Sequence, residues 1–196
     1  GIYGVAREAH AITGAPLAAA PWDGLEVEPG DEAGDLVSIS VEDTELCPRF
    51  TARVFRNVKV GESPLWLKAR LIASGQKPIN NVVDITNYVM WLTGQPMHAY
   101  DLDLVPDGEL TVRRAGAGEK VDTLDGTTRE IPEGVGIVCD KNGPAGIAGI
   151  MGGQSSGVAD STTKNLIEVA NGKAAEVRQT YTRLGLRTDS SKKKKK

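Results

Sequence analysis

The sequence has few of the side chains that metal centres and disulfide frameworks need. Its 196 residues include two cysteines, Cys47 and Cys139, and two histidines, His10 and His98. The cysteines form no closely spaced pair, which argues against a disulfide framework. The four side chains also do not form the ligand set of a structural zinc, so we expect no bound metal.

Long apolar runs are also missing. No stretch approaches the roughly 20 apolar residues that a transmembrane helix needs, and the first residues lack the basic region and apolar core of a signal peptide. We therefore expect a cytoplasmic location and no membrane partner. The 40% hydrophobic and 25% charged residues are ordinary for a folded globular chain.

Positive charge is scarce outside the last five residues. The formal net charge is −3, but without the lysine run at 192–196 the chain has 18 basic and 26 acidic residues, a net charge of −8. Such an acidic body lacks the basic field of a protein that holds nucleic acid through its phosphates alone. If RNA is a partner, other domains must hold most of it. We interpret the lysine run as an engineered or replaced end, with a natural basic tail as the alternative.

Hydrophobic periodicity in the first half predicts helices and strands in mixed order. A helix over residues 5–13, ended by Gly14, precedes a connector rich in proline, glycine and acid over residues 15–34. Alternation predicts strands over residues 36–41 and 50–60, with a turn at 47–48 between them.

Two further helices follow these strands. One is predicted over residues 65–74, with Ser63 as its N-cap, Pro64 in its first turn and Gly75 at its C-terminal end. The segment 80–94 is predicted to be the second, with Asn81 as its N-cap and Gly94 past its end.

Short strands dominate the second half. A final helix is expected over residues 174–184, and residues 125–126 (Asp-Gly) predict a hairpin turn. This order of elements favours an α+β fold with a mixed, mainly antiparallel sheet and a few packed helices. The predicted strands cover residues 110–114, 120–124, 127–131, 135–139, 145–151 and 166–170.

Two glycine-containing patterns are only weak evidence for a functional site. Residues 153–157 (GQSSG) fit the nucleophile elbow G-x-S-x-G, but no histidine follows Ser155 to complete a triad, so we interpret this match as chance and the segment as a turn. Glycine recurs every third residue from Gly143 to Gly152. Close strand packing explains this repeat most simply; a backbone wall against a flat ligand is the sharper alternative.

Two polar residues stand out by their surroundings. His98 follows a predicted helix end, where we expect a loop that aims it into a cleft, although an isolated histidine is more often structural. Glu168 shares one face of its predicted strand with Leu166 and Ala170. A carboxylate between apolar neighbours lies either at a solvated edge or in a pocket, and the sequence leaves both open.

Several long motifs together resemble the bacterial phenylalanyl-tRNA synthetase β subunit. They occur in the order and spacing of that family, and the likeness extends roughly from Cys47 to Ser191. The motifs lie at residues 78–90 (PINNVVDITNYVM), 94–101 (GQPMHAYD), 123–126 (TLDG), 148–153 (AGIMGG) and 184–191 (LGLRTDSS).

The resemblance implies a division of the chain. Residues 1–34 would be the remnant of a preceding domain plus a connector, residues 35–191 the editing domain, and residues 192–196 the lysine tail. The parent would be an α2β2 aminoacyl-tRNA ligase whose ATP and magnesium serve the other subunit, so the editing domain itself would need no cofactor.

The resemblance also implies hydrolysis of tyrosine wrongly attached to tRNA(Phe), with the tRNA acceptor end and the α subunit as partners. A hydrophobic synthetic pocket rejects an isostere that adds a hydroxyl by only about a hundredfold, so a second site is needed. Glu168 matches the glutamate that meets the tyrosine hydroxyl. The family's wall around the tyrosine ring corresponds to Ala148, Gly149 and Gly152. Its polar cluster near the scissile ester and the terminal adenosine corresponds to His98, Thr86 and Asn87.

Two departures from the family pattern bear on this reading. Lys77 stands where many relatives carry arginine, and a lysine cannot reproduce a planar bidentate fork in substrate binding. Residues 171–174 (NGKA) replace aromatic and proline residues before the last helix, which affects local packing. A non-catalytic scaffold that retains the editing fold is therefore the alternative function. A free-standing deacylase fits less well, because the chain opens on Gly1 in a domain remnant.

Overall fold

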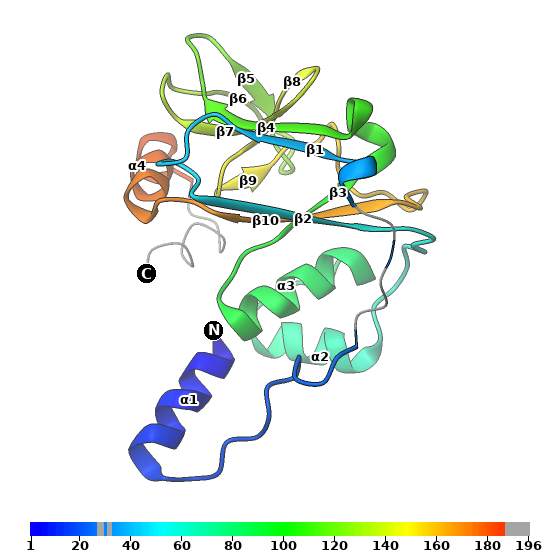
Figure 1. Ribbon diagram of the computed structural model, residues 1–196, viewed down its shortest axis with the longest axis vertical. Helices are drawn as coiled ribbons and strands as arrows, with labels where there is room; N and C mark the ends of the chain where they lie inside the picture. Colours follow the sequence, from blue (N-terminus) through cyan, green and yellow to red (C-terminus); the bar gives the residue numbers. More distant parts are fainter. Residues whose placement is uncertain (27–29, 31–32, 187–196) are drawn as a thin grey trace.

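The computed structural model describes residues 1–26, 30 and 33–186. Two β-sheets face each other in the upper part of the molecule, a pair of helices lies below the lower sheet, and a separate N-terminal helix lies lowest (Figure 1). The α+β class with mixed, mostly antiparallel pairing is confirmed. The lysine tail at 192–196 and the end of the last motif, 187–191, lie outside the described residues.

The upper sheet has five strands in the order β1-β4-β7-β8-β9, and a two-stranded ribbon of β5 and β6 lies beside it. Among the described residues, β1 and β4 pair in parallel, and the other neighbouring strands of the sheet and the ribbon pair antiparallel. The strands are β1 (Ser38–Val41), β4 (Glu109–Arg114), β5 (Lys120–Asp122), β6 (Thr128–Glu130), β7 (Gly136–Asp140), β8 (Gly143–Ile147) and β9 (Met151–Gly152).

The lower sheet has three antiparallel strands, with β10 (Asn165–Asn171) between β2 (Arg49–Phe55) and β3 (His98–Asp101). In this register Glu168 lies opposite Ala52 on one side and His98 on the other. Directly opposite residues of an antiparallel pair project from the same face. The lower sheet therefore places two polar side chains together on one face.

Four α-helices complete the described chain: α1 (Ile2–Thr13), α2 (Leu65–Ala73), α3 (Asn81–Thr93) and α4 (Ala174–Leu184). Helices α2 and α3 pack together below the lower sheet, whereas α4 lies at one end of the two sheets (Figure 1). Short 3₁₀ turns occur at η1 (Ala33–Asp35), η2 (Leu102–Leu104) and η3 (Pro106–Gly108). None of these helices has the length and apolar character required to cross a bilayer.

Burial defines two cores on the two faces of the upper sheet. The first lies between the sheets and includes Tyr100, Leu110, Val112 and Leu166, all at most 1% exposed. The second lies on the outer face, where α4 and the β5–β6 ribbon cover Ile137 and its neighbours. The first core extends to the His98–Glu168 pair, so the candidate site lies at its margin.

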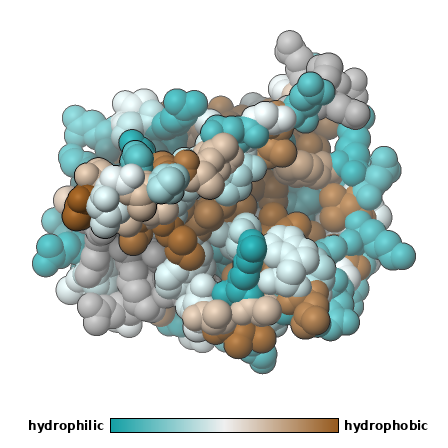
Figure 2. Space-filling model, turned by 90° about the horizontal axis from the view of Figure 1, so that it is seen from below, coloured by the Kyte–Doolittle hydropathy of each residue, from teal (hydrophilic) through white to brown (hydrophobic). Residues whose placement is uncertain are grey.

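Helix α1 contributes nothing to either core. It has no buried residue, and Ile12 is 82% exposed. The view from the helical end shows apolar residues scattered among hydrophilic ones around a hollow (Figure 2). A groove between α1, α2 and α3 is lined by residues that include Ile2, Leu71 and Leu92. The peripheral position of α1 accords with the division of the chain expected at residue 34, which stays a prediction.

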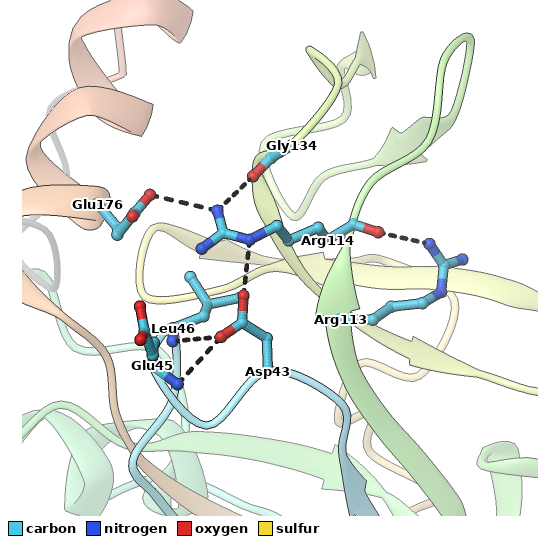
Figure 3. Close-up of polar contacts among 7 residues, drawn as sticks. All are labelled: Asp43, Glu45, Leu46, Arg113, Arg114, Gly134 and Glu176. Atoms are coloured by element: carbon cyan, nitrogen blue, oxygen red, sulfur yellow. Dashed lines mark hydrogen bonds and ion pairs between the residues drawn. The ribbon is translucent and has the colours of Figure 1, made fainter.

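An ion-pair network ties α4 to the turn that follows β1 (Figure 3). Arg114 donates to Asp43 Oδ2 over 2.7 Å and to the Gly134 carbonyl over 3.0 Å, and its Nη1 lies 3.4 Å from Glu176 Oε2. Asp43 also accepts from the backbone N–H groups of Glu45 and Leu46. The hydrogen bonds from Leu46 and from Arg114 hold the pKa of Asp43 below its usual range. This network joins elements that are distant in sequence.

Most predicted elements agree with the structure, and the helix over residues 174–184 has the predicted bounds. Gly14, Gly94 and Gly185 each end a helix in the left-handed conformation, and Gly75 has a φ of +78° just past α2. The hairpin turn at residues 125–126 is also confirmed, because β5 and β6 pair around it.

Both predicted N-caps are wrong. The side chain that accepts from Val83 N belongs to Asn80, whereas Asn81 donates to Lys59 O. Ser63 instead donates to Asp84 Oδ2 over 2.5 Å from a buried position. This long-range bond joins the segment before α2 to α3, and the sequence pattern did not indicate it.

Three strand predictions are also corrected. The segment 98–101, predicted as a loop, is strand β3, because β10 supplies its hydrogen-bonding partners. The segment 145–151 divides into β8 and β9 at the turn around Gly149. The strand predicted at 50–60 is β2, which ends at Phe55, where its pairing with β10 ends.

Candidate functional site

The site is built on the central strand of the lower sheet. Leu166, Glu168 and Ala170 of β10 are all buried, whereas the alternate residues Ile167 and Val169 are partly exposed. Glu168 is 8% exposed. Of the two positions that the sequence left open, a solvated edge or a pocket, the structure selects the pocket.

Glu168 accepts a hydrogen bond from a neutral partner. Tyr100 Oη donates to Glu168 Oε2 over 2.6 Å, and the tyrosine side chain is fully buried between the sheets. Burial and the adjacent carboxylate raise the pKa of Tyr100 well above its usual value. The phenol therefore stays protonated and remains a donor across the physiological range.

His98 lies opposite Glu168 and packs edge-on against Tyr100. The two ring centroids are 4.4 Å apart and the planes meet at 88°. The His98 Nε2 atom is buried and has no hydrogen-bond partner in the described structure. Burial lowers the pKa of His98 below its ordinary value of 6.5, opposed by the Glu168 charge. The imidazole is therefore neutral at pH 7, and its ring nitrogens can exchange a proton with a ligand or a water.

Glycine makes room for this imidazole. A Cβ added at Gly152 would lie 2.2 Å from His98 Cε1 and 2.5 Å from Nε2, too close for any side chain. Gly149 has a φ of +72°, which a glycine adopts without strain. Both residues lie in the turn and strand that form the wall opposite His98.

These residues surround one cavity at the margin of the first core. Its lining includes His98, Tyr100 and Glu168 from the lower sheet, together with a wall formed by Ala148, Gly149 and Gly152. Its volume is about 60 Å³, which leaves room for a few ordered waters. The cavity combines an apolar, glycine-rich wall with one carboxylate and one imidazole.

The structure brings five of the eight predicted site residues to this cavity. The other three, Thr86, Asn87 and Lys77, do not line it. Thr86 is buried on α3 and donates to the Val83 carbonyl over 2.8 Å, and Asn87 is partly buried on the same helix. Lys77 is exposed between α2 and α3. The roles that the resemblance implies for these three residues stay predictions.

Sequence reasoning missed Tyr100 as a site residue. It did not recognise strand β3, in which residues 98 and 100 project from the same face. Once that strand is known, its register with β10 places both residues beside Glu168. Because β3 has only four residues, its alternation gives no clear signal in the sequence alone.

The other candidate chemistries find no support in the described residues. Ser155 of the GQSSG segment is exposed in a turn, as expected for a chance match. Cys47 and Cys139 are buried and are not joined in a disulfide. No group of three or more histidine, cysteine, aspartate or glutamate side chains among the described residues is arranged to hold a metal ion.

The fold and the site define an α+β domain with a small cavity between two sheets, in which a buried carboxylate faces an imidazole. The chain belongs to the B3/4 domain family, which it matches over residues 46–196. The motif resemblance seen in the sequence is confirmed by the names of its relatives.

Two relatives carry the name phenylalanine–tRNA ligase beta subunit. The chain is 46% identical over 190 residues to that of Moorella thermoacetica and 48% identical over 191 residues to that of Carboxydothermus hydrogenoformans. Each alignment covers 97% of this chain but 23% of the relative. The chain therefore spans about a quarter of the length of these relatives.

A solved structure shares the fold. It is an N-terminal fragment of the phenylalanyl-tRNA synthetase β subunit of Pyrococcus horikoshii, with a TM-score of 0.53 and 14% sequence identity. The match covers 82% of this chain and 50% of the solved chain. At this identity the likeness concerns the fold alone.

Proposed function

We propose that the chain is an editing domain that hydrolyses the ester of tyrosine wrongly attached to tRNA(Phe). The observation that carries this proposal is the cavity in which His98, whose buried Nε2 has no hydrogen-bond partner among the described residues, lies beside Glu168 and opposite a glycine-rich wall. The names of the relatives supply the tRNA and the amino acid that their ligase would use.

Glu168 supplies the selectivity in this proposal. A carboxylate accepts hydrogen bonds and cannot donate one when ionised. A tyrosine hydroxyl would satisfy it, whereas phenylalanine would leave a buried charge facing an apolar ring. A site built to bind a hydroxyl rejects the analogue without it by about 10⁴-fold or more. The cavity would thus select the ligand that a synthetic pocket admits in error.

His98 supplies the proton transfer. The oxygen of a water attacks the ester carbonyl carbon while a neutral imidazole nitrogen accepts a proton from that water. The bond between the carbonyl carbon and the ribose ester oxygen then breaks, and the imidazolium returns the proton to the departing ribose oxygen. Water is the only co-reactant of this hydrolysis, so the proposed reaction needs no cofactor. Thr86 and Asn87 would orient the terminal adenosine from α3, and Lys77 would contact the tRNA end.

Other parts of a longer protein would deliver the substrate. The chain spans 23% of its relatives, and its acidic body is a weak ligand for RNA by itself. We propose that it acts within a β subunit that assembles with an α subunit as an α2β2 ligase. ATP and magnesium would serve ligation outside this domain.

Ester loss from tyrosyl-tRNA(Phe) tests the proposal. The chain, in excess over substrate, should release tyrosine faster than buffer does, and His98→Ala should slow this single-turnover rate by about 100-fold, the typical contribution of a general base. His10→Ala is the matched control, because His10 is exposed on α1. Absence of hydrolysis above buffer, both in the chain and in a β subunit that contains it, would reject the function.

One observation favours a non-catalytic scaffold instead. Three residues that the resemblance places at the site, Thr86, Asn87 and Lys77, lie outside the cavity lining. A scaffold has no reason to bind tyrosine more tightly than phenylalanine. Equal affinity for the two amino acids, together with no hydrolysis, would support this second candidate.

A further inference from the structure

Tyr100 contacts both polar groups of the cavity, and neither the motifs nor the comparisons give it a role. Its hydroxyl donates to Glu168 Oε2 over 2.6 Å, and its ring packs edge-on against His98 at a centroid distance of 4.4 Å. Tyr100 is 1% exposed, so solvent does not compete for its hydroxyl. One buried side chain therefore links the proposed selective group to the proposed base.

The bond fixes one half of the carboxylate. It engages Oε2, whereas the second oxygen, Oε1, is not part of it. A glutamate side chain has three rotatable bonds, and a hydrogen bond to a rigid, buried phenol restricts their rotation. A carboxylate held in this way presents its second oxygen in one direction, which a specific contact to a ligand requires.

We propose that Tyr100 is a specificity-determining positioning residue, which holds Glu168 through Oε2 so that Oε1 accepts a hydrogen bond from a ligand hydroxyl. This inference rests on the proposed function, because it assumes that Glu168 meets the hydroxyl of tyrosine. It adds that the selectivity resides in a pair of side chains on adjacent strands rather than in the glutamate alone.

The hydroxyl of Tyr100 can be removed without removing its ring. Tyr100→Phe retains the edge-on packing against His98 and the ring in the first core, and it deletes only the donor to Glu168. Glu168 would then lie in the cavity without that fixed partner. The carboxylate would rotate or recruit water, and its contact with a ligand hydroxyl would weaken.

Binding of two non-hydrolysable probes measures this effect. The probes are adenosines that carry tyrosine or phenylalanine through an amide at the 3′ position, and titration calorimetry gives the affinity ratio for each variant. Tyr100→Phe should lower the preference for the tyrosine probe by about tenfold, the effect of one well-placed hydrogen bond. Tyr3→Phe is the matched control, since Tyr3 lies on α1 and does not line the cavity.

A double-mutant cycle separates positioning from a general structural effect. If Tyr100 acts through Glu168, Tyr100→Phe should have no further effect on the preference in a Glu168→Gln background. A purely structural role would add a similar loss in both backgrounds. Circular dichroism and the melting temperature of each variant check that the fold is retained.

The outcomes distinguish this inference from the proposed function. An unchanged preference in Tyr100→Phe, additive effects in the cycle or no preference in the unmodified chain would overturn the inference. Tighter binding of the tyrosine probe by Tyr100→Phe would also overturn it, because the Tyr100 hydroxyl would then occupy the place of the ligand hydroxyl. Coupled loss of preference without any ester hydrolysis would support the inference while the function fails.

Discussion

Two buried or half-buried carboxylates of this chain have opposite surroundings. Glu168 lies in the cavity, 8% exposed, and its partner is a neutral phenol. Glu119 lies at the rim of the upper sheet in a bidentate pair with Arg113, at 2.7 and 2.8 Å. The hydrogen bond from Arg113, with help from the Gly116 N–H group, lowers the pKa of Glu119 to about 2.

The comparison distinguishes a carboxylate that stabilises the fold, Glu119, from one that is placed to contact a ligand, Glu168. The Arg113–Glu119 pair and the Arg114 network (Figure 3) neutralise charges between elements of the fold. In the cavity no lysine or arginine is among the described lining residues, and a glycine-rich wall faces the carboxylate. A buried charge without a countercharge costs stability, which is typical of functional sites.

The glycine wall gives the largest expected effect. Gly152→Ala places a Cβ only 2.2 Å from His98 Cε1. This distance is too short for two carbon atoms, so the imidazole must move. A displacement of about 1 Å in a catalytic group costs about 100-fold in rate. Hydrolysis of tyrosyl-tRNA(Phe) should fall by that factor. Gly61→Ala is the matched control, because a Cβ there meets open space; an equal loss in both variants would contradict the role of the wall.

The pH dependence of hydrolysis gives the next largest effect. Burial lowers the pKa of His98 below 6.5, so the imidazole should stay neutral and the rate constant level from pH 8 down to 6.5. Below the lowered pKa, protonation should reduce the rate about tenfold per pH unit. Single-turnover rates, corrected for buffer hydrolysis at each pH, measure this profile. A midpoint above 6.5 would show that the Glu168 charge, rather than burial, dominates at the imidazole.

The smallest expected effect is the contribution of the Arg113–Glu119 ion pair to the stability of the fold. Because the folded pKa of Glu119 is depressed from 4.5 to about 2, its contribution to stability is present above pH 4.5 and is lost as pH falls towards 2. Glu119→Gln should cost about 1–2 kcal/mol of unfolding free energy at pH 7, allowing for solvent screening. Tyrosine selectivity should not change.

Urea unfolding at pH 7 and at pH 3 measures the Glu119 contribution. Glu130→Gln is the control, since Glu130 is exposed on β6. The cost of Glu119→Gln should shrink at pH 3, whereas Glu130→Gln should have little effect at either pH. A cost that does not depend on pH would mean that packing, and not the ion pair, stabilises this rim.

Local chemistry was sufficient to predict many elements. Glycines past helix ends adopt the left-handed conformation by themselves, so Gly94 and Gly185 located two helix ends correctly. The N-cap predicted at Ser63 failed because its hydroxyl donates to Asp84 instead. The N-cap predicted at Asn81 failed because adjacent asparagines compete for that role. The structure gives the cap to Asn80, while Asn81 bonds to Lys59 twenty-two residues away.

The sequence by itself determined which residues face the same side. Alternation along β10 placed Glu168 with Leu166 and Ala170, and side chains of a strand must alternate. It also determined the α+β class and the acidic charge. Each of these properties depends on neighbours along the chain.

Only the tertiary structure decided that Glu168 has Tyr100 and His98 as its neighbours. Strand β3 has four residues, too few for a clear periodic signal, and it forms because β10 pairs with it from 68 residues away. The Gly152 contact with His98 and the long-range bond between Ser63 and Asp84 arise in the same way. Pairing between distant segments depends on the whole fold, so the cavity and its charge environment exist only after the two sheets have packed together.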